Sequence, residues 1–475
     1  MAIALPAWRA LQGFPVRIAG WTLAHAVTLA GNVPVLAGLA WWFFPFEDKP
    51  LHAFWVVPAL FLLGAVLLFW LFRRPRTPAV SVAALVLLGY AVQMGLGWAE
   101  GRGLDGIRDR IRTSGHAEFA RVAVRVQDTR NVLSHYEEFA RDGRLGDYGR
   151  TKPPGQLLLY VATARVANWL NPLPPDKRLR WLETFAALTW PLATFLVLWP
   201  MYRLGRWYGG HHAALVACAL YTLVPSVALV TLHTDGVFFP LLAATAAVLA
   251  LTAARRRSAL RGCLAGAWMN AALFFSFSLV CLLPALLLAP VAYTDAASPW
   301  KVRLRSAARV SAGFAAGFVL AGILLLLLLD YDPLQRWQAA MSYHAEWKSW
   351  SWSLRDVLNS GLTNLAEFGS WLGVPALGLY LVDLRRVGRG PDLRRLAGPA
   401  IFTFALLAAL VAAAFLGTTR GETARLWLFA VPFVCLSAGR TLSRLEFDRR
   451  HKVLALMLLL EAGTTVLIKR YQDFW

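Results

Sequence analysis

The chain alternates between long runs of apolar residues and short loops that carry most of its charge. A helix crosses the roughly 30 Å hydrocarbon core of a bilayer with about 20 apolar residues, and most of these runs approach that length. Backbone polar groups inside a bilayer must be hydrogen-bonded within the protein, and the alternating strands of a membrane barrel are not seen. The pattern therefore predicts an all-α polytopic membrane protein, with a single integral membrane domain over residues 1–475.

The apolar runs predict about 13 transmembrane helices. They cover residues 16–43, 52–72, 78–99, 181–204, 212–231, 236–254, 262–275, 277–293, 308–329, 366–384, 397–416, 424–440 and 452–468. The first run is too long for a signal peptide and lacks a small-residue cleavage site, so we expect it to remain as a span. The stretch 262–293 lies between two basic loops and must enter and return, so we divide it near Ser276.

Basic clusters fall in alternate loops, which predicts a cytoplasmic N-terminus and an external C-terminus. The segment 156–170 is apolar but short and is interrupted by Arg165, so we expect an interfacial or re-entrant helix on the outer face. The outer face then carries the long loops 100–180 and 330–365. Since long loops usually carry function, this asymmetry indicates extracytoplasmic chemistry.

Composition excludes several classes of protein. Hydrophobic residues make up 58% of the chain and charged residues only 16%, against about 25% charged residues in a soluble domain. The net charge of +21 does not indicate nucleic acid, because the arginines and lysines gather in loops beside the membrane, where they attract anionic lipids. The four cysteines lie in apolar runs without a disulfide or zinc spacing. The Ala- and Arg-rich composition suits a bacterial inner (plasma) membrane.

Loop 100–155 has apolar residues at helical spacing, which predicts an amphipathic helix at the membrane surface. These residues are Phe119, Val122, Val126, Leu133 and Tyr136. The loop ends in Lys152-Pro153-Pro154-Gly155. The prolines impose an extended backbone before them, Pro154 can start a helix, and Gly155 allows close approach. We expect Lys152 to be held at the level of the lipid headgroups, where a cation suits a lipid-linked phosphate.

These elements resemble the GT-C glycosyltransferases, in particular the protein O-mannosyltransferases and the lipid A aminoarabinose transferases. The matching pieces are the Lys152–Gly155 motif, Asn168-Trp169, the segment Asp176–Trp181 with Arg178 or Arg180, and Thr231–Asp235. The family usually has an Asp-Glu pair directly after the first span. Here two further spans precede the outer loop, and the acidic residue of that motif has no unique counterpart.

The resemblance implies transfer of a sugar from a polyprenyl-phosphate donor to an extracytoplasmic acceptor, by a single inverting displacement. Fixed cations stabilise the phosphate that leaves, and a carboxylate takes the proton of the acceptor hydroxyl. Lys152 is the first expected phosphate-binding residue. The expected base is Glu118, then Asp128, with the adjacent Glu137 and Glu138 third. No metal or other cofactor is expected.

A second outer site is expected around Arg420 and Arg425, on either side of Glu422. These arginines lie on the outer face against the positive-inside trend, so we expect Arg425, and after it Arg420, to bind the donor phosphate. The alternative is a capped turn with an internal ion pair.

Four further residues are candidate substrate contacts: His233, Asp235, His344 and Glu346. Asp235 is alternatively the N-cap of the span that begins at residue 236. His344 and Glu346 lie in loop 330–365 beside three tryptophans, which indicate a membrane-interface belt more often than a sugar platform.

Two other classes of function remain. A transporter or flippase of a lipid-linked saccharide would show internal repeats with broken spans at matching positions, and no repeat is seen. A membrane scaffold would leave the Lys152–Gly155 motif unexplained. The acceptor, whether lipid, glycan or protein, and the sugar stay open.

The topology is testable by cysteine labelling. Ser134→Cys, in the long outer loop, should react with a membrane-impermeant reagent in intact cells, whereas Arg256→Cys, in a basic inner loop, should react only after the membrane is opened. Equal labelling of the two variants would contradict the predicted topology.

Overall fold

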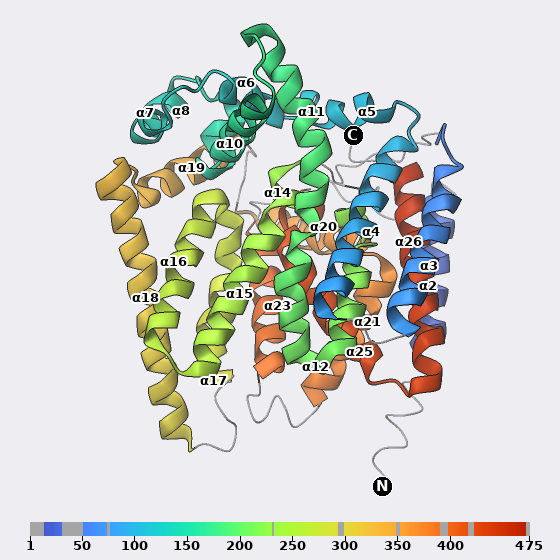
Figure 1. Cartoon of the computed structure of the whole chain (residues 1–475). Coiled ribbons are helices and arrows are strands. Elements are labelled where there is room, and N and C mark those ends of the chain that lie inside the picture. Colours follow the sequence, from blue (N-terminus) through green and yellow to red (C-terminus); the bar gives the residue numbers. More distant parts are fainter. Residues whose placement is uncertain are drawn as a thin grey trace.

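A computed structural model of the chain describes residues 14–30, 51–73, 77–229, 232–292, 299–347, 352–389, 398–416 and 422–471. These residues form helices, turns and loops and no strand, so the predicted all-α class is confirmed. Figure 1 shows a bundle of upright helices with a layer of shorter helices across its upper end. Residues 31–43 of the first predicted span, Arg420 and Trp475 lie outside the described residues.

The upright helices of the bundle are α2 (Phe14–Ala30), α3 (Val56–Arg73), α4 (Pro78–Trp98), α11 (Pro175–Thr194), α12 (Leu198–Tyr221), α15 (Phe239–Arg256), α16 (Ala259–Phe275), α17 (Leu283–Ala292), α18 (Trp300–Leu329), α21 (Val374–Arg389), α23 (Gly398–Phe415), α25 (Val431–Ser443) and α26 (Phe447–Tyr471). Among the described residues, six helical segments are long and apolar enough to cross a membrane, or up to seven if one bent pair counts as a span. The class of a helical membrane protein is therefore supported, while the number of about 13 spans stays a prediction.

Two predicted breaks between apolar runs are confirmed. Helix α12 reverses at Gly209 and Gly210, where the backbone is non-helical and Gly210 has a φ of 83°. Its two halves then pack so closely that a Cβ on Gly205 would collide with Ala214. Helix α16 ends before Ser276, whose backbone is extended, and the 3₁₀ helix η2 (Phe277–Leu282) leads into α17.

The apolar run predicted as a span over residues 366–384 is not one continuous helix. Helix α20 (Leu354–Leu372) and α21 meet at an angle of 111°. The bend lies at Gly373, whose φ of 79° is strained for any residue with a side chain, and Pro375 follows it. Loop 330–365 correspondingly contains α19 (Pro333–Trp347) and the first half of α20.

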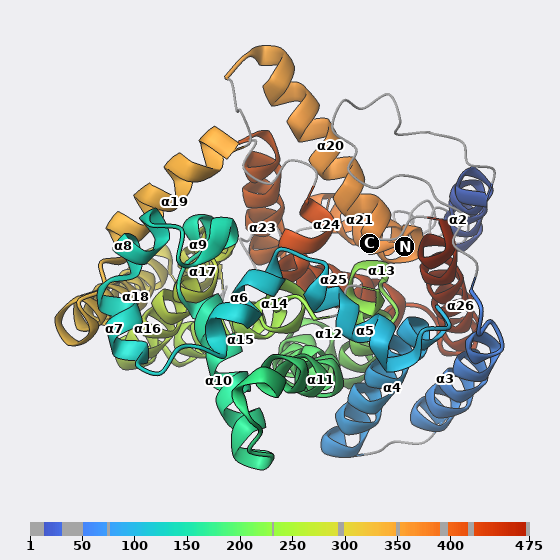
Figure 2. The same ribbon diagram turned by 90° about the horizontal axis from the view of Figure 1, so that it is seen from above.

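The upper layer comes from the predicted outer loop. It contains α5 (Gly103–Arg112), α6 (His116–Ala123), α7 (Thr129–Ser134), α8 (Tyr136–Arg141), α9 (Gly146–Thr151) and α10 (Gly155–Leu170). The amphipathic helix predicted here is thus several short helices. They have an apolar core of their own, which includes Phe119 and Tyr136 and packs against the upper part of α11. The separate helix expected at 156–170 is α10, which lies in this layer (Figure 2).

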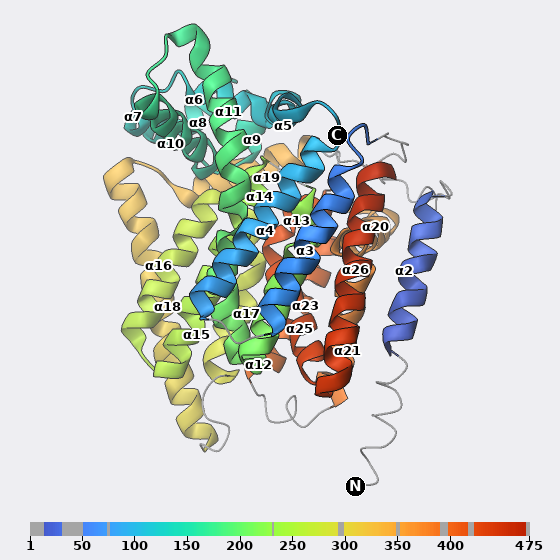
Figure 3. The same cartoon turned by 45° about the vertical axis from the view of Figure 1, so that its right-hand side comes forward.

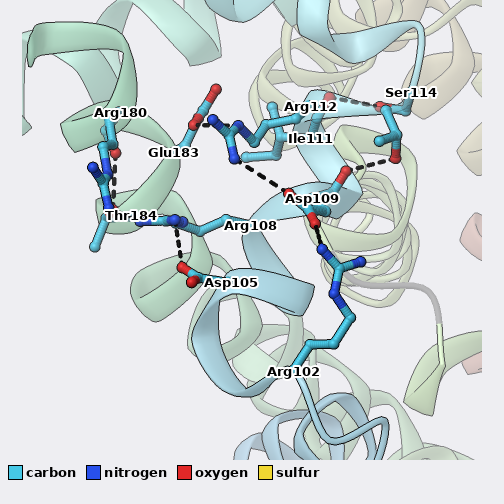
Figure 4. Close-up of polar contacts among 11 residues, drawn as sticks. Arg102, Asp105, Arg108, Asp109, Ile111, Arg112, Ser114, Arg180, Glu183 and Thr184 are labelled. Carbon is cyan, nitrogen blue, oxygen red and sulfur yellow. Dashed lines mark hydrogen bonds and ion pairs between the residues drawn. The ribbon is translucent and has the colours of Figure 1, made fainter.

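Ion pairs fasten the upper layer to the bundle. Arg112 Nε lies 3.3 Å from a carboxylate oxygen of Glu183 on α11, and Arg108 reaches Thr184 one residue further (Figure 4). Glu100, before α5, pairs with Arg110 and with Lys469 near the end of α26. The last turn of α26 therefore lies at the same end of the bundle as loop 100–155 (Figure 3).

Glycines set the contact between α16 and α18. Gly262 and Gly266 on α16 face Gly313 and Gly317 on α18, so each helix carries two glycines four residues apart. A Cβ on any of the four would meet backbone atoms of the other helix. Small residues at this spacing allow the close backbone approach that stabilises helix pairs in membranes.

Replacing Gly266 by alanine should therefore separate these helices. The added methyl meets the backbone of Phe314, and we expect a loss of about 1–3 kcal/mol in the free energy of unfolding in detergent. Gly463→Ala on α26 is the matched control, because no heavy atom lies within 4 Å of its added Cβ. Equal stability of the two variants would contradict the glycine contact.

Candidate functional site

Four charged or polar side chains from distant parts of the sequence meet beneath the upper layer. His116 begins α6, His233 precedes the short helix α14 (Thr234–Val237), Asp235 lies in α14, and Arg425 lies in α24 (Thr423–Leu426). Figure 2 shows these three helices close together when the bundle is seen from above. We call His116, His233, Asp235, Glu422 and Arg425 the outer cluster.

Arg425 connects the outer cluster. Its Nη1 lies 3.0 Å from Nδ1 of His233 and its Nε 3.4 Å from Oδ2 of Asp235. Its Nη2 lies 3.2 Å from Oε2 of Glu422. The ring centroids of His116 and His233 are 4.2 Å apart. Both histidines and Asp235 are buried. The negative charge of Asp235 is therefore compensated by Arg425 and not by water.

The contacts of Arg425 bear on two expectations from the sequence, the ion pair within its own turn and the role of Asp235. The internal ion pair with Glu422, which was the structural alternative for this turn, is present. The same guanidinium also contacts Asp235, so the arginine does more than close its own turn. Asp235 is not a helix N-cap, since His233 and Phe238 hold those positions for α14 and α15.

The Lys152 motif has the predicted backbone. Lys152 is extended, with φ −117° and ψ 152°, as expected before a proline, and α10 begins at Gly155. A Cβ on Gly155 would collide with the carbonyl oxygen of Phe274 on α16, which explains the need for glycine. The Lys152 ammonium lies 5.8 Å from the ring centroid of Tyr148, and Tyr148 in turn packs on His116. Lys152 thus lies beside the outer cluster.

The second outer loop holds this motif in place. Arg336 of α19 is fully buried and donates a hydrogen bond to the carbonyl of Arg150, two residues before Lys152. It also lies 3.2 Å from Glu137, so that predicted third-rank base serves as an ion-pair partner. Glu138, its neighbour, is exposed. The sequence analysis did not find Arg336, because nothing in its local sequence separates it from other loop arginines.

The two acids ranked first as bases have local structural contacts. Oε2 of Glu118 accepts a hydrogen bond from the backbone N–H of Tyr148, at 3.1 Å, and lies against Gly146. Asp128 is the N-cap of α7 and accepts from the N–H groups of Arg130 and Asn131. Glu118 lies in the same helix as His116, while Asp128 is exposed at the start of another helix.

His344 and Glu346 lie near the end of α19. His344 packs on Trp347, whose ring centroid is 6.1 Å from that of Tyr148, so this end of α19 borders the site. Glu346 is exposed.

Both histidines of the outer cluster are neutral at physiological pH. Burial lowers the pKa of His116 well below its usual range, and the positive charges of Arg425 and Lys152 lower it further. Burial also lowers the pKa of His233, with His116 and Arg425 acting in the same direction. Neutral imidazoles keep a lone pair that can accept a proton, a hydrogen bond or a metal ion.

Three residues of the outer cluster have the chemistry of metal ligands. One ligand atom each from His116, His233 and Asp235 lies within 4.8 Å of the other two. The sequence did not indicate a metal. This set could not be found there, because His116 is far from the other two along the chain and the three have no motif spacing.

No protein-family model and no curated protein matches the chain.

The neutral histidines make stability depend on pH. The unfolded chain binds protons at these imidazoles below about pH 6.5, whereas the folded chain resists them. The free energy of unfolding should therefore fall as pH drops below about 6.5, by about 1.4 kcal/mol per pH unit for each histidine. The melting temperature of a His116→Gln, His233→Gln double variant should fall less steeply than that of wild type as the pH drops below about 6.5. The exposed His135→Gln is the control. The same pH dependence of the melting temperature in all three proteins would contradict the role of His116 and His233.

Proposed function

We propose that the protein is a GT-C-type glycosyltransferase of the bacterial inner membrane, which moves a sugar from a polyprenyl-phosphate donor to an extracytoplasmic acceptor. The observation that carries the proposal is the meeting of Lys152 and Arg425. These two cations come from separate outer segments: Lys152 lies over the ring of Tyr148, which packs on His116, and Arg425 pairs with a buried carboxylate, Asp235. The acceptor is a lipid, a glycan or a protein, and membrane lipids surround the bundle.

Two cations at one place suit a phosphate that leaves. Cleavage of the bond between the anomeric carbon and the phosphate oxygen leaves negative charge on that oxygen, and fixed positive groups stabilise it in the transition state. Arg425 offers a planar, permanently charged group that binds phosphate with two hydrogen bonds, and Lys152 offers a compact charge. Arg336 and the prolines keep Lys152 in position before the donor arrives.

The acceptor hydroxyl requires a base, and Asp235 is the carboxylate we propose first. It is buried in the outer cluster, and its Oδ1 has no hydrogen-bond partner among the described residues. Glu118 and Asp128, the acids ranked first from sequence, remain alternatives. Their carboxylates serve backbone N–H groups of α9 and α7, which favours Asp235 over both.

A transporter or flippase of a lipid-linked saccharide is the second candidate. The 111° bend between α20 and α21 is the observation that favours it, because broken helices form the substrate sites of many transporters. Measuring whether the bound lipid reaches both leaflets separates the two functions: movement of the intact lipid-linked sugar indicates the transporter, and release of polyprenyl phosphate indicates the enzyme.

The phosphate contacts can be tested with polyprenyl phosphate, the product common to all such donors. Lys152→Ala should weaken its binding by the loss of one charge-assisted hydrogen bond, about 1.5–3 kcal/mol, with little change in thermal stability. Arg425→Lys keeps the charge but loses the two-point contact and should also weaken binding. The exposed Lys177→Ala is the control. If wild type binds the uncharged polyprenol as tightly as the phosphate, the site does not recognise phosphate.

The base can be identified by comparing three amide variants. Asp235→Asn should lower the release of polyprenyl phosphate from a panel of polyprenyl-phosphate sugars by about 10²–10⁴-fold while product binding survives. Glu118→Gln should lower thermal stability more than turnover, because its carboxylate holds Tyr148. Asp128→Asn should leave turnover unchanged. Full turnover in Asp235→Asn with a dead Glu118→Gln would restore the ranking made from sequence.

A further inference from the structure

The outer cluster contains buried ligand atoms whose hydrogen-bonding capacity is not used. Nδ1 of His116 and Oδ1 of Asp235 are buried and have no hydrogen-bond partner among the described residues. Buried polar atoms usually have a partner in the protein, a water molecule or an ion. Here the two atoms lie on side chains that, together with His233, bring three ligand atoms within 4.8 Å of one another.

We propose that His116, His233 and Asp235 bind one zinc ion. Two imidazoles and a carboxylate are a ligand set that zinc favours, and three protein ligands leave a fourth position open for an oxygen from water or phosphate. Calcium and magnesium prefer sites made of oxygen ligands, so they should bind poorly here. The proposal concerns binding alone and holds whether or not the site transfers a sugar.

The geometry requires only a small closure. Tetrahedral zinc bonds of about 2.0–2.1 Å place neighbouring ligand atoms about 3.4 Å apart. The three ligand atoms already lie within 4.8 Å of one another, so side-chain rotations that move each atom by about an ångström bring them to this spacing.

Arg425 competes with the metal ion. Its guanidinium lies against Nδ1 of His233 and Oδ2 of Asp235, so it supplies the positive charge that the carboxylate needs when no ion is bound. Arg425 has a second carboxylate, Glu422, within 3.2 Å and can keep this ion pair while it leaves His233. Zinc at Nδ1 of His233 then replaces one cation by another, and the proton on Nε2 stays in place.

A different group of histidines provides an internal control. His211 and His212 follow the reversal at Gly210, and the ring of His212 lies 6.2 Å from that of His451 on α26. None of these three histidines belongs to the group of possible metal ligands found among the described residues. Adventitious zinc would be expected there or at exposed histidines.

The experiment measures metal bound to the whole chain in detergent. The protein is stripped with a chelator, equilibrated with zinc, calcium or magnesium, and analysed for metal content and for the metal-induced shift in melting temperature. Wild type should bind about one zinc ion per chain with high affinity. His116→Gln and His233→Gln should each weaken binding by more than the roughly 10–100-fold that loss of an outer-shell partner causes. Arg425→Gln should strengthen it.

His212→Gln and His135→Gln are the controls and should keep wild-type zinc binding. Zinc should raise the melting temperature of wild type and of both controls but not that of His116→Gln, which separates lost binding from lost folding. Loss of zinc in His212→Gln with retention in His116→Gln and His233→Gln would overturn the proposal. Tighter binding of calcium than of zinc, or no zinc bound to wild type, would overturn it as well.

Discussion

Most of this chain has to satisfy its backbone hydrogen bonds without water, and the rest of the structure follows from that constraint. Helices satisfy it locally, so the apolar runs become upright helices whose own side chains carry little chemistry. Charged groups that are not structural ion pairs are then confined to the ends of the bundle. At the upper end, short helices with a separate apolar core cover the bundle. They pack His116 of the outer cluster against the rings of Phe119 and Tyr160.

Within that cluster, the burial of charge determines what each side chain does. Asp235 is buried and needs a nearby cation, which Arg425 provides. Arg425 carries a second acid, Glu422, so its charge is shared between two partners. A guanidinium held in this way is ready to meet an anion or to yield to a metal ion without leaving an isolated charge in a medium of low polarity.

Sequence patterns predicted the parts of the structure that depend on local rules. The all-α class, the extended Lys152 before its prolines, the close approach at Gly155 and the break at Ser276 all follow from residue type and spacing. The bend at Gly373 was missed because a lone glycine in an apolar run is compatible with a continuous helix. The meeting of His116 with His233, and the support of Lys152 by Arg336, depend on tertiary packing between distant segments, and no local spacing reports such contacts.

The glycine contact between α16 and α18 also has a mechanical consequence. The two helices should move as one rigid pair, since their backbones are in close contact along two turns. The upper end of α16 presses its Phe274 carbonyl against Gly155, and α18 continues into α19, which carries Arg336 to the carbonyl of Arg150. The segment around Lys152 is therefore held by α16 on one side, at Gly155, and through α18 and α19 on the other, at Arg150. Any change in the tilt of this helix pair would therefore be passed to Lys152 through both contacts.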